Sequence, residues 1–465
     1  MPAPYDLLIV GAGPGGYVAA IRARQLGLSV GLIESTHLGG ICLNWGCIPT
    51  KVMLKGTDIL DGASHAERFG LVALSPAIDP DRLIARATEV SGLLAQGVAF
   101  LLKKNGVDLI WGHAKLTAPG EVDVSASATP APRGALTEGL YQAPHVILAT
   151  GARPRILPGL EPDGHLVWTY YHALRPPAVP ARLVIVGAGA IGVEFASIYA
   201  AMGTTVTLVE QAPRILPVED AEIAGLMAKA LQKRGIIIYT AVPITRLDRT
   251  DDSVALHLSD GTVIQADRLL SAAGVVPNID GLQDLGVETA GGAVRTDTAG
   301  RTSVPGLYAI GDVAGPPMLA HKAEHDGVAC VDAIAGRTPA LSTAPIPACI
   351  YANPQIASVG LTADAAAAAG LSTRTGRFSL RGNGKALVIG APDGLVKCVF
   401  DTATDRLVGA QIIGPDASEL IHGLTIAVTL GATSTQLAGV VFPHPTLSEA
   451  LHEAVLAARD GAIHA

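Results

Sequence analysis

The chain carries one pattern of hydrophobic and polar positions twice. Residues 7–10 (Leu, Leu, Ile, Val) form a short apolar run that ends at Gly11, and residues 183–186 (Leu, Val, Ile, Val) form another that ends at Gly187. Each run precedes a stretch of helical length, a glycine and a second apolar run. Gly11 and Gly187 stand 176 positions apart, and the features that follow them keep the same offset. The pattern therefore predicts two equivalent β-α-β units.

The remaining pattern predicts an α/β protein with several domains. Residues 146–149 form another buried strand, and Asp260-Gly261 marks the turn of a hairpin. From about residue 344 the pattern changes to hairpin strands (396–400, 407–413) followed by helices (near 416–430, 434–440 and 446–459). We predict two Rossmann-like dinucleotide-binding domains and a C-terminal α+β domain. The predicted boundaries are 1–150, 151–276, 277–343 and 344–465.

Composition and charge exclude several classes of protein. The 33 Lys and Arg against 41 Asp and Glu give a net charge of −8 without any basic block, which argues against a nucleic-acid partner. No apolar run approaches the ~20 residues that a membrane span needs. The opening residues 1–4 lack the regions of a secretion signal, and the five cysteines are an odd number. These features predict a cytoplasmic protein with no membrane partner.

Both predicted units carry residues suited to a dinucleotide. Glycines of a G-x-G-x-x-G turn allow a pyrophosphate to approach the N-terminus of the following helix. The second apolar run of each unit ends in an acid, Glu34 or Glu210, which can accept hydrogen bonds from a ribose. Ordinary glycine turns of a parallel sheet are the alternative, but strand, helix and acid stand in register in both units. The glycines are Gly11, Gly13 and Gly16 in the first unit and Gly187, Gly189 and Gly192 in the second.

Residues 39–51 hold two cysteines, Cys42 and Cys47, five positions apart. A regular helix would point these side chains away from each other, whereas a disulfide needs its Cβ atoms roughly 3.5–4.5 Å apart. Gly46 and Pro49 allow the turn to be distorted. Since strained or exposed disulfides are the more easily reduced ones, we predict a redox-active disulfide.

Other interpretations of the two cysteines remain open at this point. A structural disulfide is uncommon in a reducing compartment, and a zinc half-site would need a second Cys or His pair at ligand spacing. Two unrelated core cysteines stay possible from this stretch alone. Lys51, which follows Cys47 by one helical turn, adds a positive charge that favours a thiolate or another anion.

The C-terminal region offers a candidate acid/base. Pro443 and Pro445 fix the backbone around His444, and Glu449 follows five positions later. In one interpretation Glu449 orients His444 as an acid/base. In the other, Thr446-x-x-Glu449 is a capping box, in which Glu449 accepts a hydrogen bond from the Thr446 N–H. The residues alone do not decide between the two.

The chain resembles the flavin-dependent pyridine nucleotide–disulfide oxidoreductases. The resemblance rests on the two dinucleotide units, the Cys-x4-Cys after the first acid and the sequence His444-Pro445-Thr446-x-x-Glu449, and it covers essentially the whole chain. It implies FAD and NAD as cofactors and the oxidation of protein-bound dihydrolipoamide to lipoamide with NAD+. It also implies a homodimer whose partners are the lipoyl domains and E2 core of a 2-oxo acid dehydrogenase complex.

The same resemblance implies a role for individual residues. Cys47 would lie against the flavin, with Cys42 farther out, and Lys51 would sit by the flavin ring, paired with Glu194. His444 and Glu449 of one subunit would stand beside the cysteines of the other. Residues 277–343 would complete the FAD site, and 344–465 would form the dimer interface. The cofactor-binding residues would be Gly11, Gly13, Gly16, Glu34, Thr150, Gly151 and Asp312 for FAD, and Gly187, Gly189, Gly192, Glu210 and Gly274 for NAD.

Alternatives within the same fold are a reductase of another disulfide or of a metal, and a diaphorase or transhydrogenase. Glu210 would repel the 2′-phosphate of NADP, and the C-terminus carries no further cysteine pair. Three positions depart from the family pattern. Val275 stands where many members have Arg, Phe442 replaces a second His, and Trp45 occupies a position that is often Val.

Overall fold

The computed structural model describes residues 5–72, 75–338 and 345–464, and its chain forms two compact units. Unit 1 comprises Met1–Val52, Asp81–Arg155 and Gly274–Thr343. Unit 2 comprises Met53–Pro80, Ile156–Ala273 and Ala344–Ala465. The four-part division made from the sequence stays a prediction, and its boundary at 343/344 lies outside the described residues.

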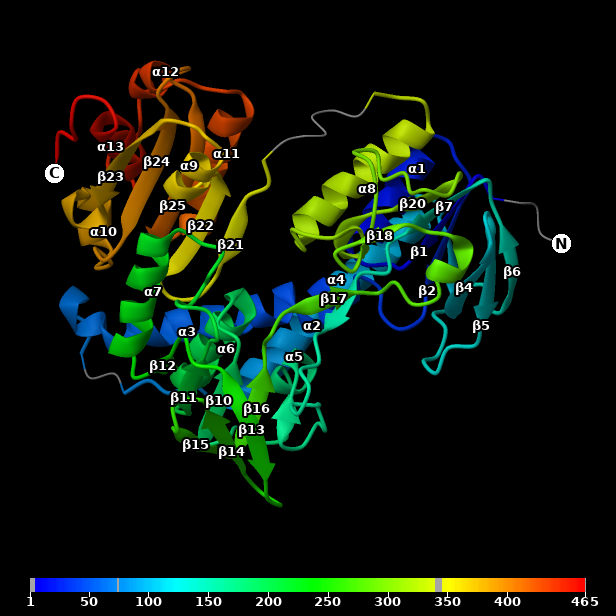
Figure 1. The fold of residues 1–465 in the computed structure, drawn as a ribbon, viewed down its shortest axis with the longest axis horizontal. Helices are drawn as coiled ribbons and strands as arrows, with labels where there is room; N and C mark the ends of the chain where they lie inside the picture. Colours follow the sequence, from blue (N-terminus) through cyan, green and yellow to red (C-terminus); the bar gives the residue numbers. More distant parts are fainter. Residues whose placement is uncertain (1–4, 73–74, 339–344, 465) are drawn as a thin grey trace. The chain divides into compact units, whose positions relative to one another are not determined.

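Unit 1 is built on a five-stranded parallel sheet in the order β20-β7-β1-β2-β3. Alternate residues of β1 (Leu7–Val10) enter different cores. Leu7 and Ile9 pack with helices α1 and α8, which lie side by side (Figure 1). Leu8 and Val10 pack with the separate three-stranded sheet β4-β5-β6. The apolar run is therefore buried on both faces, as expected for a strand inside a parallel sheet.

The elements of unit 1 follow the chain in three segments. The first holds β1, α1 (Pro14–Gln25), β2 (Val30–Glu34), α2 (Gly40–Trp45) and the start of α3 (Cys47–Ser64). The second holds α4 (Pro80–Lys104), β3 (Asp108–Trp111), β4 (His113–Ala118), β5 (Glu121–Ser125), β6 (Gly139–Gln142), β7 (His145–Leu148) and β8 (Ala152–Pro154). The third holds β17 (Val275–Pro277), η2 (Gln283–Leu285), β18 (Thr289–Ala290), β19 (Ala293–Val294), β20 (Leu307–Ala309), η3 (Gly311–Ala314) and α8 (Ala320–Ile334).

Unit 2 contains the second β-α-β unit, so the predicted duplication is confirmed. β10 pairs in parallel with β11 and β16 in a sheet of order β12-β11-β10-β16-β9, just as β1 pairs with β2 and β7. The predicted hairpin at Asp260-Gly261 joins β14 to β15. The elements are η1 (Ala66–Phe69), β9 (Val167–Trp168), α5 (Tyr170–Ala173), β10 (Arg182–Val186), α6 (Ala190–Ala201), β11 (Thr205–Val209), α7 (Ala221–Lys233), β12 (Ile237–Tyr239), β13 (Ile244–Arg249), β14 (Val254–Leu258), β15 (Val263–Ala266) and β16 (Arg268–Ser271).

The C-terminal part of unit 2 is the predicted α+β domain. Its antiparallel sheet has the order β21-β22-β25-β24-β23, and helices α11 and α13 pack against it (Figure 1). Phe378, Phe400 and Ile412 form part of the shared core. The elements are β21 (Ala348–Ile350), β22 (Gln355–Gly360), α9 (Ala363–Ala368), β23 (Thr373–Ser379), η4 (Leu380–Gly382), α10 (Gly384–Val388), β24 (Leu395–Asp401), β25 (Leu407–Gly414), α11 (Ala417–Thr429), α12 (Ser434–Ala438) and α13 (Glu449–Ala457).

A buried ion pair joins α7 to this sheet. Lys397 on β24 donates to Asp220 at 2.7 Å, and only 9% and 6% of the two side chains are exposed. Asp220 also caps α7, because its carboxylate accepts hydrogen bonds from the N–H groups of Glu222 and Ile223. Removing one member of such a pair leaves a buried charge without its counterion. We infer that this contact fixes α7 against the C-terminal sheet.

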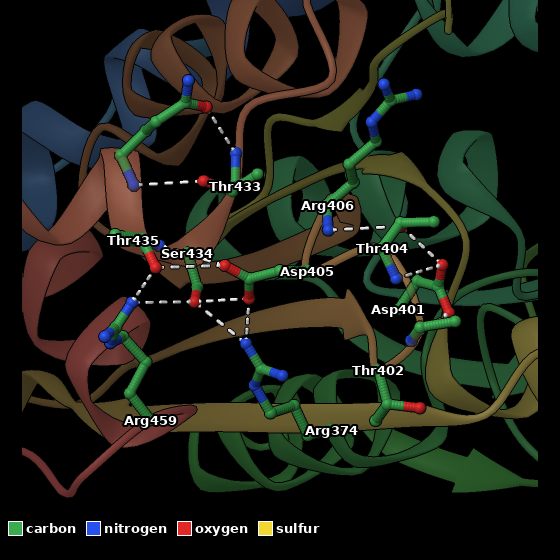
Figure 2. A network of polar contacts seen from close by, with 12 residues as sticks. Arg374, Asp401, Thr402, Thr404, Asp405, Arg406, Thr433, Ser434, Thr435 and Arg459 are labelled. Atoms are coloured by element: carbon green, nitrogen blue, oxygen red, sulfur yellow. Dashed lines mark hydrogen bonds and ion pairs between the residues drawn. The ribbon is translucent and has the colours of Figure 1, made fainter.

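Asp405 organises a second polar network in the same domain (Figure 2). It has a positive φ of 60°, and its carboxylate accepts hydrogen bonds from Arg374, Ser434 and Thr435. Arg459 donates to the Ser434 and Thr435 hydroxyls from the end of α13. The network thereby ties the turn after β24 to the start of α12 and the end of α13.

Two further observations concern the sequence-based expectations. The variable region near residues 118–140 contains β5 and the start of β6, which the hydrophobic pattern did not predict. Among residues 5–72, 75–338 and 345–464, no helix is long and apolar enough to cross a membrane.

Candidate active site

A break in the helix at Gly46 brings the two cysteines together. α2 ends before Gly46, whose φ of −144° and ψ of −111° are not helical, and α3 begins at Cys47. The Thr50 N–H and hydroxyl both donate to the Gly46 carbonyl, at 3.1 and 2.6 Å. A Cβ at Gly46 would lie 3.2 Å from the Ile41 carbonyl oxygen. The distortion predicted at this glycine is therefore confirmed.

Both cysteines carry thiols in the structure, and the two side chains are hydrogen-bonded to each other. That hydrogen bond, burial and the negative charge that Cys47 can carry all raise the pKa of the Cys42 thiol. Lys51 opposes this rise with its positive charge, whereas Glu324 adds to it. Because the Cys42 pKa is raised, the protonated form of Cys42 is favoured in the reduced pair.

The cysteine stretch is attached to the first glycine turn. The Gly39 N–H donates to the Ala12 carbonyl at 2.8 Å. Gly40 has a positive φ of 58°, and a Cβ on it would lie only 2.8 Å from the Cα of Gly13. Only a glycine tolerates both the conformation and this close approach. The structure therefore places the cysteine pair next to the turn that the sequence predicts to bind FAD.

The two glycine turns have the same geometry and fit a pyrophosphate. A Cβ at Gly16 would meet the Gly11 carbonyl oxygen at 1.8 Å, and a Cβ at Gly192 would meet that of Gly187 at 1.9 Å. The middle glycines are open: the nearest atom to a Cβ at Gly13 is 4.0 Å away, and Gly189 has none within 4 Å. Gly13 and Gly189 are also the N-cap residues of α1 and α6. Open space before a helix N-terminus is what a diphosphate requires.

The two strand-end acids also have matching contacts. One oxygen of Glu34 accepts from the Ala12 N–H at 2.9 Å, and one oxygen of Glu210 accepts from the Ala188 N–H at 2.8 Å. Each carboxylate thus lies against its own glycine turn, at the position where the ribose of a dinucleotide is recognised. The residues of both turns therefore fit the groups that the sequence predicts.

The other predicted FAD residues lie in unit 1 at the ends of neighbouring strands. Thr150 and Gly151 follow β7, and the Thr150 hydroxyl donates to the Asn278 carbonyl at 3.0 Å. Asp312 follows β20, and burial raises its pKa, as does the nearby charge of Asp326. β7 and β20 pair in parallel, so the carboxyl ends of both strands face the same edge of the sheet.

His444 and Glu449 are in direct contact, and both interpretations of the pair are supported. The His444 Nδ1 lies 2.9 Å from Glu449 Oε1, while the Thr446 N–H donates to Glu449 Oε2 at 2.8 Å. The N–H of Thr446 and the His444 ring together lower the pKa of Glu449. The His444 side chain is 78% exposed, so its other ring nitrogen is open to a substrate.

The capping box is only half formed. The Thr446 hydroxyl donates to the Pro443 carbonyl at 2.7 Å, and the N-cap residue of α13 is Ser448. Phe442, which replaces a second histidine of the family pattern, stacks on His452 with 5.0 Å between the ring centres. An apolar phenyl ring therefore occupies the position where the family pattern has a second imidazole.

The predicted pairing of Lys51 with Glu194 stays a prediction. Glu194 on α6 is buried, and one of its oxygens accepts from the Tyr351 N–H at 2.9 Å. Gly274 follows β16 and has a positive φ of 89°. Its carbonyl accepts from the Arg155 N–H at 3.0 Å.

Two residues near the cysteines were not found from the sequence. Tyr17 on α1 and Glu324 on α8 are 307 positions apart, yet the Tyr17 hydroxyl donates to Glu324 at 3.4 Å. Neither residue belongs to a motif used above, and a contact across this separation leaves no local signal in the pattern. Only the packing of α1 against α8 reveals it.

Comparison with family models gives two matches. Residues 5–327 match the model described as pyridine nucleotide-disulphide oxidoreductase. Residues 346–455 match the dimerisation domain of the same description. Together the two models account for nearly the whole chain.

Individual relatives extend this comparison. The chain is 52% identical to a dihydrolipoyl dehydrogenase of Rhizobium etli, with 98% of each chain covered. It is 47% identical to a dihydrolipoyl dehydrogenase of Zymomonas mobilis, with 99% of each chain covered. Among solved structures, LpdA from Mycobacterium tuberculosis matches with a TM-score of 0.87 and 28% identity, over 97% of this chain and 98% of that one.

Proposed function

The chain belongs to the pyridine nucleotide-disulphide oxidoreductase family, and we propose that it is the NAD-dependent enzyme that oxidises protein-bound dihydrolipoamide to lipoamide. It is an oxidoreductase that uses FAD and NAD, and its dimerisation domain makes it a homodimer. The observation that carries the proposal is the thiol pair Cys42 and Cys47, held in contact beside the first glycine turn.

The protein's own residues hold the two cofactors. The α1 N-terminus, the turn Gly11 to Gly16 and Glu34 bind the ADP half of FAD. The α6 N-terminus, the turn Gly187 to Gly192 and Glu210 bind NAD. The flavin supplies two-electron chemistry between a dithiol and a nicotinamide. A negative charge at Glu210 disfavours a ribose 2′-phosphate, which explains a preference for NAD.

The cysteines perform the exchange with substrate. A thiolate of dihydrolipoamide attacks Cys42 of the oxidised pair, and Cys47 leaves as a thiolate. The second substrate thiol then attacks the sulfur bonded to Cys42, which closes the lipoamide ring and returns Cys42 as a thiol. The substrate is oxidised by two electrons, and the pair is reduced by two. Lys51 supports the negative charge that develops here.

His444 acts as the base for this exchange. Its Nδ1 is held by Glu449, which leaves Nε2 to accept the proton of a dihydrolipoamide thiol. The base comes from the other subunit of the homodimer, beside the Cys42 and Cys47 of its partner. Each site thus depends on both subunits.

The proposed partners are lipoyl domains and the E2 core of a 2-oxo acid dehydrogenase complex. The proposal rests on the two relatives described as dihydrolipoyl dehydrogenases. We also propose a cytoplasmic location, since the five cysteines are an odd number, which suits a reducing compartment.

An anaerobic titration with dihydrolipoamide tests the proposed function. We expect stoichiometric dithiol to reduce the holoenzyme and to produce a long-wavelength thiolate-to-flavin absorption band. NAD+ should then reoxidise it, and glutathione disulfide and mercuric ion should be poor electron acceptors in steady-state assays. A holoenzyme that dihydrolipoamide fails to reduce would overturn the proposal.

Two matched serine variants test the assigned roles. Cys47→Ser should retain FAD without any thiolate band, and dihydrolipoamide should not reduce its flavin. Cys42→Ser keeps the thiol assigned to the flavin side, so its band should persist without added dithiol. A band in Cys47→Ser that is absent from Cys42→Ser would reverse the assignment.

A further inference from the structure

Helices α12 and α13 carry the His444 loop, residues 439–448, between them. The loop begins after the last residue of α12 and ends at the first residue of α13. At the opposite ends of these helices, Arg459 donates to the hydroxyls of Ser434 and Thr435 (Figure 2). The two helices are therefore tied to each other independently of the loop that connects them.

His452 on α13 makes two contacts at the first half of this loop. Its Nε2 lies 3.0 Å from the carbonyl oxygen of Ala438, the last residue of α12. Because a carbonyl oxygen only accepts, this ring nitrogen carries the hydrogen and donates it. The same imidazole stacks on Phe442, with 5.0 Å between the ring centres and 30° between the ring planes. One side chain thus holds both the end of α12 and the middle of the loop.

The contact at Phe442 affects His444 because the backbone between the two residues has little freedom. Pro443 and Pro445 have a φ fixed at about −65°. A residue that precedes a proline is restricted as well, and this applies to both Phe442 and His444. Phe442 is also partly buried against the core of the C-terminal domain. A fixed Phe442 therefore leaves few positions that the His444 side chain can take.

Glu449 and His452 lie on one face of α13, since residues three positions apart on a helix are neighbours. Glu449 Oε1 lies 2.9 Å from His444 Nδ1 and so holds the ring itself. After His444, the buried Asn383 donates to the Thr446 carbonyl at 3.0 Å. The chain is thus anchored on both sides of the base, and the anchor before it is the stacked pair of His452 and Phe442.

We propose that His452, through its contact with Phe442, is a positioning residue for the base: it holds the His444 loop so that the Nε2 of His444 faces a dihydrolipoamide thiol. This rests on the proposed function, in which His444 accepts the proton of that thiol. His452 acts through the loop and takes no part in the making or breaking of bonds.

The two half-reactions of the holoenzyme separate the positioning of the base from general damage. Stopped-flow absorbance follows the reduction of the flavin by dihydrolipoamide, which needs the base, and by NADH, which transfers a hydride without a thiol proton. We expect His452→Ala to slow the first reaction roughly ten- to hundredfold, because a small displacement of a catalytic group has an effect of this size. Reduction by NADH should keep the wild-type rate.

Further variants identify the contact that carries the effect. Phe442→Tyr keeps a ring for stacking and should keep the wild-type rate with dihydrolipoamide, whereas Phe442→Ala should lose as much as His452→Ala. His452→Gln keeps an N–H donor and methylene groups that cover part of Phe442, so its rate should lie between. Since the two residues act as one unit, the double variant Phe442→Ala/His452→Ala should be no slower than the slower single variant.

His464→Ala is the matched control, because His464 lies outside the loop and also contacts α13, through Glu453. It should leave both half-reactions unchanged. If His452→Ala does not fold, Phe442→Leu tests the same contact, since leucine removes the ring but remains a large apolar side chain. Phe442→Leu should then slow the reaction with dihydrolipoamide alone. Flavin absorbance confirms that each variant is folded.

The outcomes distinguish this inference from the proposed function. Wild-type rates with dihydrolipoamide in folded His452→Ala and Phe442→Ala would overturn the positioning role. So would an equal loss in the reaction with NADH or in His464→Ala, or losses that multiply in the double variant. Each of these results leaves the proposed function intact, because the wild-type protein still oxidises dihydrolipoamide. A wild-type holoenzyme that dihydrolipoamide fails to reduce would overturn the proposed function, and the inference with it.

Discussion

At the scale of single residues, Glu449 makes one contact from each of the two patterns that the sequence suggested. One carboxylate oxygen lies 2.9 Å from the His444 ring, and the other accepts the Thr446 N–H at 2.8 Å. The sequence left the orientation of a base and the capping of a helix as alternatives. A carboxylate has enough lone pairs for both contacts, although the capping box is only half formed because the N-cap residue of α13 is Ser448.

His444→Gln tests the base. Because general-base catalysis contributes about 10²–10⁴-fold, we expect dihydrolipoamide turnover to fall by that factor while FAD stays bound. Steady-state kinetics with free dihydrolipoamide and flavin absorbance provide the two measurements. His464→Gln is a matched control, since His464 also pairs with a glutamate of α13, Glu453. Comparable losses in both variants would argue against a specific role for His444.

Glu453→Gln should show a pH-dependent loss of stability. Burial would raise the pKa of Glu453, but its bonds to the His464 ring and to the N–H groups of Ile463 and His464 leave that pKa lowered. A lowered carboxyl pKa stabilises the fold above the usual value of 4.5, and the effect is lost as pH falls through the folded-state pKa. We expect a cost of about 1.5–3 kcal/mol near neutral pH.

Urea unfolding at pH 7 and at pH 3 measures this difference. The gap between Glu453→Gln and the wild type should narrow at the lower pH, because protonated Glu453 resembles glutamine. A gap of constant size at both values would contradict the electrostatic explanation.

At the scale of elements, the repeated turn shows which contacts the sequence encodes locally. The first and last glycines of each turn would clash with backbone if substituted, and the middle glycine is open. The last glycine of each turn meets the carbonyl of the first, so the spacing was sufficient to predict that contact. The first glycines instead meet the distant carbonyls of Ala149 and Ala272, which the spacing does not specify. Strands β5 and β6 lie in a stretch rich in Ala, Pro and Ser. β5 pairs with β4 on one side and with β6 on the other, and it does alternate buried Val122 and Val124 with polar residues. The alternation spans only five residues, which is too short to stand out in such a stretch.

Alanine substitutions in the two turns should have separable effects. A Cβ at Gly16 would overlap the Gly11 carbonyl, so Gly16→Ala should yield protein with little bound FAD. Gly192→Ala should retain FAD and weaken NAD binding by roughly tenfold to a hundredfold, as overpacking of about 1–3 kcal/mol predicts. Flavin absorbance and the KM for NAD+ check these outcomes.

Gly62→Ala provides the control, because a Cβ at this position in α3 meets nothing within 4 Å. It should leave both cofactors bound. Loss of FAD in Gly192→Ala, with retention in Gly16→Ala, would reverse the assignment of the two turns.

At the scale of the whole molecule, the two dinucleotide units are each completed within one chain, whereas the proposed active site needs two chains. The two β-α-β units each form a sheet within the chain, so each can complete its own glycine turn. The thiol pair lies in unit 1, whereas His444 lies in unit 2. The proposed function combines these groups from different subunits.

Complementation between two inactive variants tests that combination. If the base comes from the other subunit, a mixed dimer of Cys47→Ser and His444→Gln has one active site with both substitutions and one with neither. Random mixing puts half of the chains in such dimers, so co-expression should restore about a quarter of wild-type activity. Differently tagged copies allow the mixed dimer to be isolated and assayed. An inactive mixed dimer would place the base and the cysteines in the same subunit.

The sequence by itself determined the features that depend on residues close together in the chain. These are the contact between the last and first glycine of each turn, the strand-end acids beside those turns and the distortion at Gly46. Spacing specifies them because a few backbone dihedrals control each one. Tertiary structure alone decided that Glu324 of α8 meets Tyr17 of α1. That contact follows from how two helices pack, and packing depends on the shape of many distant side chains at once.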